Sequence, residues 1–419
     1  MHEVTKLENG LTIASAKMSG MASVSVGIWV GIGSRHETAE ENGAAHFIEH
    51  MLFKGTQSRS AREIVAEVEG LGGYLNAYTS EDHTCYYARG RGDRWRSLVE
   101  VLWDMYSDSA FAAAEVRRER EVIKEERAMY LDDPSAQVQE LLGATMWPDH
   151  PLGRPIEGDL KSLDGLGRRE LVRFAGKRYG PENTCIVAAG NIDHQSLVKA
   201  ISRLGKNWTV VADSSCEPAP EDQTEPRIAV IRRDVEQTQL AMAVKTCPRS
   251  DRRRHSLRLL NALLAENMSS RLYQVLREQH GLAYSIYSTP GYYSDAGDLT
   301  ITAGVDSESL PKVFRLMRRE FRRLREHAPT QVELKQAKEY VLGQFDLFLE
   351  STENRMTWIG EGLIVDGNVG TPDTVKRRLR SVTAAQVQQA AIDFLRPERL
   401  SLALVGPDPK SGDLGKSFL

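Results

Sequence analysis

The sequence predicts an α+β fold of two homologous domains, each a mostly antiparallel sheet covered by helices on one face. Three observations predict this fold: an internal repeat at a constant offset, apolar strand patterns at both ends of each copy, and long helical patterns between them. The length of 419 residues alone allows about two to four domains. The repeat reduces that range to two.

The repeat is clearest near the end of each half, where both copies show a helical pattern, a turn with proline and a buried strand closed by glycine. The turn prolines are Pro181 and Pro397, and the closing glycines are Gly190 and Gly406. Both pairs are separated by 216 residues. A shared offset over several features indicates the duplication of one supersecondary unit.

The remaining strands and a linker complete the two halves. Residues 212–226 contain three prolines among mostly polar residues, which is the composition of a linker. We therefore expect a first domain at 1–211, a linker at 212–226 and a second domain at 227–419. The strands expected at the start of each half are 11–15 and 24–30, and 227–231 and 240–244.

A helix is expected directly after residue 60. Ser60 and Glu63 have the spacing of a capping box, in which two side chains satisfy backbone amides at the start of a helix. Gly72 and Gly73 end the pattern. The expected apolar stripe of this helix is Ile64, Val65, Val68 and Leu71.

Composition and charge exclude several classes of protein. Hydrophobic residues at 41% and charged residues at 27% are ordinary for a globular chain. A net charge of -4 provides no global basic field, so we expect no nucleic-acid partner. No apolar run reaches the ~18 residues of a membrane span and no leader pattern is visible, so we expect a cytoplasmic protein without membrane attachment. Four scattered cysteines without a CxxC pair predict free thiols in a reducing compartment.

The segment with the clearest chemistry contains His46, Glu49 and His50 in the order H-x-x-E-H. On a helix, positions four residues apart lie on one face, so both imidazoles can bind a common ion. The apolar flanks predict a buried helix, where three polar groups need a partner. A core hydrogen-bond network is the alternative; we predict one zinc ion per chain. Glu49 would then act as general base on the metal-bound water, which predicts metal-assisted hydrolysis of a peptide bond. The second half of the chain lacks this motif.

A third metal ligand must come from elsewhere, because catalytic zinc sites have three protein ligands as a rule. The helical pattern at 115–130 places two acids on an otherwise apolar face. Periodicity leaves the choice between these acids, Glu119 and Glu126, open. The full stripe consists of Glu119, Val122, Ile123, Glu126, Met129 and Tyr130.

Residues 46–56 resemble the zinc-binding signature of the pitrilysin (insulinase-like) metallopeptidases, in particular the short-chain branch similar to the β-subunit of mitochondrial processing peptidase. The resemblance covers essentially the whole chain. It implies that Glu126 is the third metal ligand and that Glu119 supports the site as an outer partner. It also implies that Asn76 and Ala77 hold the backbone of an extended peptide substrate at a sheet edge.

The second half contains Arg277 and Tyr284, which are similar to the family's Arg/Tyr pair. The resemblance implies that these two residues stabilise the oxyanion and hold the peptide. It also implies assembly, since this chain supplies two of the four homologous domains that enclose the family's chamber. We expect a homodimer that closes as a clamshell, in which Arg277 and Tyr284 of each subunit serve the partner's zinc.

Two other functions compete with a zinc endopeptidase. Some relatives are non-catalytic structural or assembly subunits, or obligate heteromeric partners, of processing-peptidase-like complexes. A peptide-binding module is the third hypothesis. The intact set of His46, Glu49, His50 and Glu126 favours the enzyme, because a scaffold has no need of the base.

Overall fold

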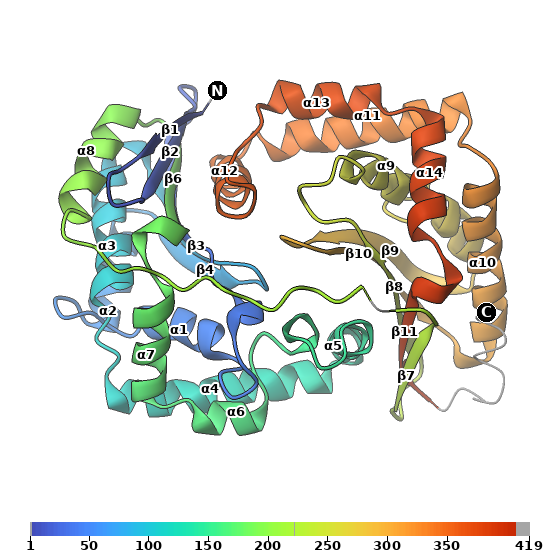
Figure 1. The fold of residues 1–419 in the computed structure, drawn as a ribbon, viewed down its shortest axis with the longest axis horizontal. Coiled ribbons are helices and arrows are strands. Elements are labelled where there is room, and N and C mark those ends of the chain that lie inside the picture. The colour runs from blue at the N-terminus through green and yellow to red at the C-terminus, as the bar shows by residue number, and fades with distance from the viewer. Residues whose placement is uncertain (1, 222, 408–419) are drawn as a thin grey trace. The chain divides into compact units, whose positions relative to one another are not determined.

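The structure is a computed structural model that describes residues 2–221 and 223–407. The described chain divides into two compact units. Unit 1 consists of residues 2–127, 154–217 and 346–371, and unit 2 consists of the segments between and after these. Each unit is built around one sheet (Figure 1). The fold is therefore α+β with two sheets, as the sequence predicts.

Unit 1 contains a sheet in which β4 is an edge strand. Its strands, in spatial order, are β1 (Glu3–Lys6), β2 (Thr12–Lys17), β6 (Thr184–Gly190), β3 (Ser23–Val30), β5 (Thr84–Arg91) and β4 (Tyr74–Thr79). β2 and β6 are parallel, and every other neighbouring pair is antiparallel. The predicted mostly antiparallel sheet is confirmed.

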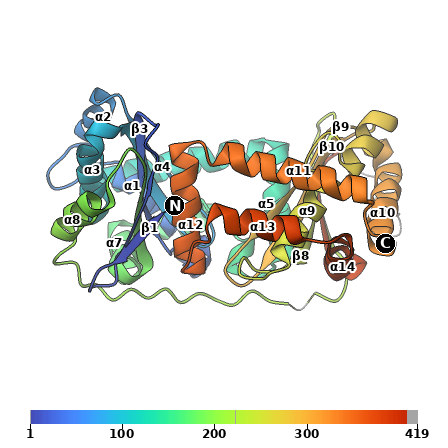
Figure 2. The ribbon, with the colours of Figure 1, turned by 90° about the horizontal axis from the view of Figure 1, so that it is seen from above.

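One face of this sheet is covered by helices of the same half of the chain. Their apolar side chains form a core with Ile13, Val26, Ile28 and Ile186 of the sheet. These helices are α1 (Ala44–Leu52), α2 (Ala61–Gly70), α3 (Trp95–Asp108), the first part of α4 (Ala113–Asp132), α6 (Leu160–Gly165), α7 (Arg168–Arg178) and α8 (His194–Leu204). The layers are visible in Figures 1 and 2.

Helix α2 begins and ends where the sequence predicts. Ser60 Oγ accepts a hydrogen bond from Glu63 N, and Ser60 N donates to Glu63 Oε2 at 2.7 Å. Ile64 and Val68 are buried as expected. Val65 is wrong as a stripe member, since it is 41% exposed.

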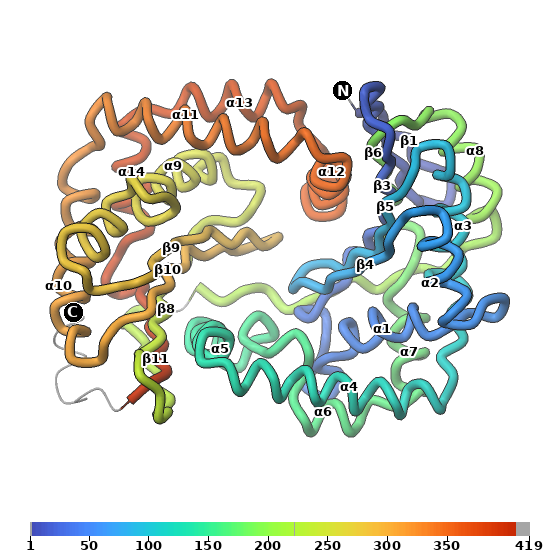
Figure 3. Tube along the Cα trace, turned by 180° about the vertical axis from the view of Figure 1, so that it is seen from behind, coloured from blue at the N-terminus to red at the C-terminus, as the bar shows by residue number. Residues whose placement is uncertain are grey.

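The other face of the sheet is also covered, by α12 (Thr352–Asp366) from the far end of the chain (Figures 1 and 3). Met356 and Ile359 of α12 pack against Trp29 in a second buried cluster. Gly360 permits this close approach, because a Cβ there would lie 2.5 Å from the Trp29 ring. The expectation of helices on one face is therefore wrong, because a helix from the other half of the chain covers the second face.

Unit 2 repeats the arrangement. Its strands, in spatial order, are β7 (Arg227–Arg232), β11 (Leu400–Gly406), β8 (Thr238–Thr246), β10 (Gly297–Val305) and β9 (Ala283–Tyr292). β7 and β11 are parallel, like β2 and β6 in unit 1, and the other neighbouring pairs are antiparallel. All four strands expected at the starts of the two halves are thus present, as are the two before the closing glycines.

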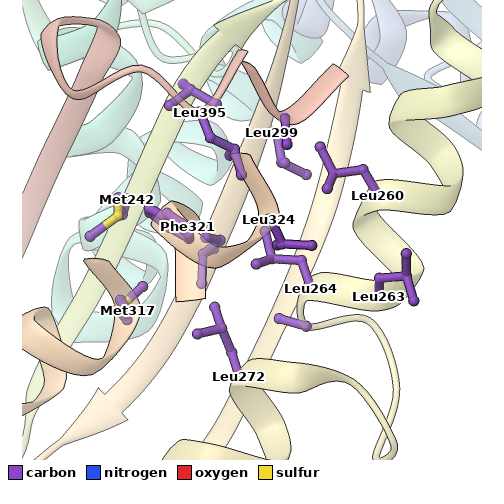
Figure 4. Close-up of a cluster of buried hydrophobic side chains, with 14 of the residues drawn as sticks. Met242, Leu260, Leu263, Leu264, Leu272, Leu299, Met317, Phe321, Leu324 and Leu395 are labelled. Atoms are coloured by element: carbon purple, nitrogen blue, oxygen red, sulfur yellow. The ribbon is translucent and has the colours of Figure 1, made fainter. Parts of the chain in front are cut away.

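Helices cover both faces of the second sheet as well. One face carries a large apolar core, part of which appears in Figure 4. The helices that contribute to it are α9 (Arg254–Leu264), α10 (Leu310–Glu326), α11 (Gln331–Phe348), α13 (Pro372–Ser381) and α14 (Ala384–Phe394). The other face packs against α5 (Pro134–Met146), which comes from the first half of the chain. One face of each sheet is thus covered by a helix from the opposite half of the chain.

The repeat explains this exchange. α7 and α14, and β6 and β11, are each offset by 216 residues in their bounds. α5 follows the long helix α4, and α12 follows its equivalent, α11. α5 and α12 are therefore equivalent elements, and each packs on the sheet of the opposite half of the chain. The compact units therefore take in 128–153 and 346–371 from opposite halves. The domains predicted at 1–211 and 227–419 remain a prediction about the duplicated halves.

Two smaller expectations concern the whole chain. All four cysteines are free, as predicted. No helix in the described part of the chain is long and apolar enough to cross a membrane. The described residues of the expected linker, 212–226, form no helix or strand.

Candidate metal centre

Helix α1 is the element that positions the H-x-x-E-H residues. It begins at Gly43, whose φ of 92° lies in the left-handed region that glycine tolerates. The buried carboxylate of Glu37 satisfies the first turn: Oε2 accepts from Gly43 N at 2.8 Å and Oε1 from Ala45 N at 2.7 Å. Burial raises the pKa of Glu37 to about 8, against the opposing effect of these amides. Sequence reasoning missed Glu37, because it lies seven residues before the helix begins.

Three side chains converge beside α1. The Nε2 atom of His50 lies 3.6 Å from Glu126 Oε2, and that of His46 lies 3.9 Å from the same oxygen. One ligand atom from each of the three residues falls within 4.8 Å of the others. The predicted convergence of His46 and His50 on one helix face is therefore confirmed as geometry.

The donor set fits a zinc ion. Ligand atoms bound to one tetrahedral zinc at ~2.0–2.2 Å lie roughly 3.3–3.6 Å apart, close to the separations here. Burial, followed by the neighbouring His50, lowers the pKa of His46 to about 3, so its imidazole is neutral at pH 7 and has a lone pair to offer. His46 Nδ1 is buried without a hydrogen-bond partner. The side chains are 10% (His46), 21% (His50) and 35% (Glu126) exposed, so the cluster is partly open to solvent, most of all at Glu126.

The two acids left open by the sequence have different contacts. Glu126 faces both Nε2 atoms, whereas Glu119 Oε2 lies 3.3 Å from the other ring nitrogen of His50, Nδ1. Glu119 is buried, and its Oε1 lies 2.8 Å from Lys54 Nζ. Lys54, which lies two residues past the end of α1, is a contact that sequence reasoning missed.

The expected apolar stripe of α4 is narrower than predicted. Val122, Met129 and Tyr130 are 45%, 73% and 42% exposed. The residues of α4 that are buried are Val116, Glu119, Ile123 and Arg127. The spacing rule placed Glu119 and Glu126 on the helix that lies beside the histidines. It made the buried stripe too wide, because spacing does not fix how wide a face the neighbours cover.

Glu49 points to a neighbour on the sheet. Thr79 Oγ1, at the end of β4, donates a hydrogen bond of 2.6 Å to Glu49 Oε2. Burial raises the pKa of Glu49, and Thr79 and His50 oppose that rise. A carboxylate with a raised pKa beside a candidate metal cluster has the properties of a general base. Thr79 was not predicted to have a role.

Asn76 and Ala77 lie on β4, opposite Tyr87 and Tyr86 of β5. Because β4 ends the strand order, its other side has no strand partner among the described residues. Ala77 N donates to the Asn76 side-chain oxygen at 2.9 Å, so this amide points away from β5. An added peptide strand could bond to this edge, for which the Asn76 side chain would have to release the Ala77 amide.

Arg277 and Tyr284 belong to unit 2. Arg277 lies in the helical turn at Tyr273–Gln279, and Tyr284 lies in β9. The guanidinium carbon is 5.2 Å from the Tyr284 ring centroid and 5.1 Å from that of Tyr273. The structure thus brings this pair together, with Tyr284 78% exposed.

Comparisons with known proteins agree with the fold and the cluster. The family model "Insulinase (Peptidase family M16)" matches residues 12–160, and "Peptidase M16 inactive domain" matches residues 165–341. The chain is 35% identical over 408 residues to an uncharacterized zinc protease of Mycobacterium tuberculosis, covering 96% of this chain and 92% of the relative. It is also 35% identical over 400 residues to the uncharacterized zinc protease YmxG of Bacillus subtilis, covering 96% and 97%.

Two crystal structures share the fold. A protease from Helicobacter pylori superposes with a TM-score of 0.91 at 22% identity, over 97% of this chain and 99% of that chain. A peptidase M16 inactive domain from Pseudomonas fluorescens superposes with a TM-score of 0.90 at 19% identity, over 97% and 98%. The chain belongs to the insulinase family of peptidases, family M16, which confirms the predicted family.

Proposed function

We propose that the protein is a zinc-dependent endopeptidase that hydrolyses extended or unfolded peptides. The observation that carries the proposal is the convergence of His46, His50 and Glu126, with the raised-pKa carboxyl of Glu49 on the same helix. The zinc protease names of the relatives support the metal. His46, His50 and Glu126 would hold the ion, and Glu119 would orient His50 through Nδ1.

Zinc bound to these residues would polarise the scissile carbonyl and lower the pKa of the attacking water. Glu49 takes the proton from that water. Thr79 holds Oε2 of Glu49, which leaves Oε1 to accept the proton and later deliver it to the leaving amine. The raised pKa brings the Glu49 carboxyl closer to neutral pH, where a group can both accept and return a proton.

The substrate backbone would lie along β4. Asn76 and Ala77 sit on the free side of this edge strand, and main-chain hydrogen bonds to a strand give affinity with little sequence preference. This supports a peptide substrate in extended form. The peptide passes the edge near Thr79, the residue that contacts Glu49.

We further propose a homodimer in which Arg277 and Tyr284 of each subunit serve the partner's metal cluster, inside a chamber that closes around the peptide. The exposed tyrosine and its neighbouring guanidinium support a role in holding an oxyanion. This arrangement corresponds to the short-chain branch of the family. A non-catalytic assembly subunit or an obligate heteromeric partner is the alternative.

Replacing Glu49 with Gln tests the proposal. The purified wild type is expected to contain about one zinc per chain and to cleave a quenched fluorogenic peptide. Glu49→Gln is expected to keep its zinc and lose at least about 100-fold in kcat, since a general base contributes ~10²–10⁴-fold. Glu125→Gln, an exposed position on α4, is the control and should match the wild type. A zinc-loaded wild type that cleaves no peptide, or a Glu49→Gln chain as active as the wild type, would contradict the proposal.

A further inference from the structure

Unit 2 contains an apolar groove of about 200 Å³ on the side of the sheet that faces α10. Its floor is made by side chains from α10, β8, β11 and the segment after α14. Figure 4 labels four of these residues within the cluster of buried side chains: Met242, Met317, Phe321 and Leu395. Each of the four is at most 7% exposed. These four side chains lie buried at the base of the groove, and the groove itself opens to solvent.

An apolar groove that is open to water leaves apolar side-chain surface hydrated, which is unfavourable. Apolar cavities of about 150 Å³ stay dry and take up apolar ligands such as benzene. The groove is larger and is open at its mouth. An apolar ligand is what would fill it.

The mouth of the groove is cationic. Three arginines line it: Arg318, Arg322 and Arg325. Arg318 and Arg322 are exposed and make no ion pair within the described residues, whereas their neighbours Arg319 and Arg323 both pair with Glu320. Arg325 has a buried Nε atom without a hydrogen-bond partner. The groove thus offers guanidinium groups that no carboxylate of the described chain compensates.

The shape favours a small amphiphile over a protein. A protein partner would need an exposed apolar patch around the groove, yet α10 exposes no large apolar side chain, and Pro397 is the one exposed residue among the apolar residues that line the groove. What the site presents is an apolar groove with three arginines of α10 at its mouth. That combination is complementary to one alkyl chain that ends in one anionic group.

We propose that this groove binds a long-chain carboxylate, with the alkyl chain between Met242, Met317 and Phe321 and the carboxylate between Arg318 and Arg322. Arg325, behind them, provides a further donor through Nε. The site belongs to unit 2 alone and is independent of the proposed peptidase function. Its ligand class is a fatty acid.

Dodecanoate is the probe for the test, below its micellar concentration and with the full-length protein. Calorimetric titration should give saturable binding of one dodecanoate per chain, and dodecanoate should raise the melting temperature, since a ligand that binds the folded state stabilises it. Arg318→Gln and Arg322→Gln should each weaken dodecanoate binding about tenfold, because a charge-assisted hydrogen bond contributes ~1.5 kcal/mol or more. Dodecanol, which lacks the charge, should bind these variants and the wild type equally.

Two matched variants complete the design. Arg315→Gln lies on the exposed face of the same helix outside the groove and should bind dodecanoate like the wild type. Met317→Trp fills the interior and should abolish binding of both probes while the circular dichroism spectrum is retained. The proposal is overturned if the wild type shows no saturable dodecanoate binding, if Arg315→Gln weakens it as much as Arg318→Gln, or if only anionic vesicles or nucleic acid bind α10.

Discussion

Lys54 forms a chain of contacts with Glu119 and His50: its Nζ atom lies 2.8 Å from Glu119 Oε1, and Glu119 Oε2 lies 3.3 Å from His50 Nδ1. Glu119 is only 3% exposed, so removing the ammonium leaves a buried carboxylate without its cation. At the scale of the residue, we therefore predict that Lys54→Met weakens zinc binding about 10–100-fold, the usual cost of losing an outer partner of a metal ligand. Competition with a chelator measures this.

The control for Lys54 is Lys124, a lysine on α4 that also pairs with carboxylates. Lys124 contacts Asp164 at 2.6 Å and Glu121 at 3.4 Å, on the exposed side of α4. Lys124→Met should leave the zinc affinity unchanged. If Lys54→Met binds zinc as tightly as the wild type, the contact to Glu119 has no influence on the metal cluster.

Asp298 is predicted to make stability depend on pH. It is buried in β10, where Tyr293 and Thr300 each donate to it at 3.0 Å, and burial raises its pKa. Above the unfolded pKa of ~3.9, the folded state therefore binds more protons than the unfolded state, and stability falls as pH rises towards the raised pKa. Asp298→Asn should keep the fold, since both hydroxyls can turn to the amide, and should flatten this fall. Melting temperatures between about pH 4 and pH 8 measure it, and an unchanged slope would refute the assignment.

At the scale of the element, Gly360 tests whether α12 packs on the sheet of unit 1 as the structure shows. A Cβ on Gly360 would lie 2.5 Å from the Trp29 ring, whereas one on Gly343, in α11, would meet no atom within 4 Å. Gly360→Ala should destabilise the protein by about 1–3 kcal/mol through overpacking. Gly343→Ala should be neutral or stabilise it by up to ~1 kcal/mol, because alanine favours a helix. Thermal unfolding compares the two, and equal effects would contradict the packing of α12.

The elements differ in how far the sequence could predict them. Strands such as β6 and β11 are buried throughout, consist mostly of apolar residues and end in glycine, so their identity follows from the local pattern. The packing of α12 on the first sheet does not, because an amphipathic pattern reports that a face is buried and not what covers it. The same limit applies to α4, where Met129 fits the spacing but is exposed. Glu37 and Lys54 escaped prediction since their roles depend on contacts that only the fold creates.

At the scale of the whole molecule, the repeat was the most informative sequence feature. An offset of 216 residues predicts equivalent helices and strands, and α7 and α14 obey it at both ends. The metal motif occurs in the first copy alone. The candidate metal cluster therefore belongs to unit 1, whereas the Arg277 and Tyr284 pair belongs to unit 2. The near-neutral net charge conceals a local excess of arginine on α10, which the global sum could not reveal.

The separation of the two clusters allows the proposed dimer to be tested by mixing subunits. Neither Glu49→Gln nor Tyr284→Phe alone should be active. In a mixed dimer with shared sites, the subunit that retains Glu49 is served by the intact Tyr284 of its partner, so one of two sites works. Random pairing makes half of the dimers mixed, and the expected recovery is about a quarter of wild-type activity.

The comparison that decides the geometry is the double variant. The double variant carries Glu49→Gln and Tyr284→Phe on one chain and is mixed with wild type. If sites are shared between subunits, each site of the mixed dimer then has one defect. Shared sites then give activity from wild-type dimers alone, about a quarter of the total, whereas sites formed within one chain give about half. Mixed dimers can be counted by native mass spectrometry. Recovery in the first mixture together with a quarter in the second supports completion of each site by the partner, and no recovery in the first refutes it.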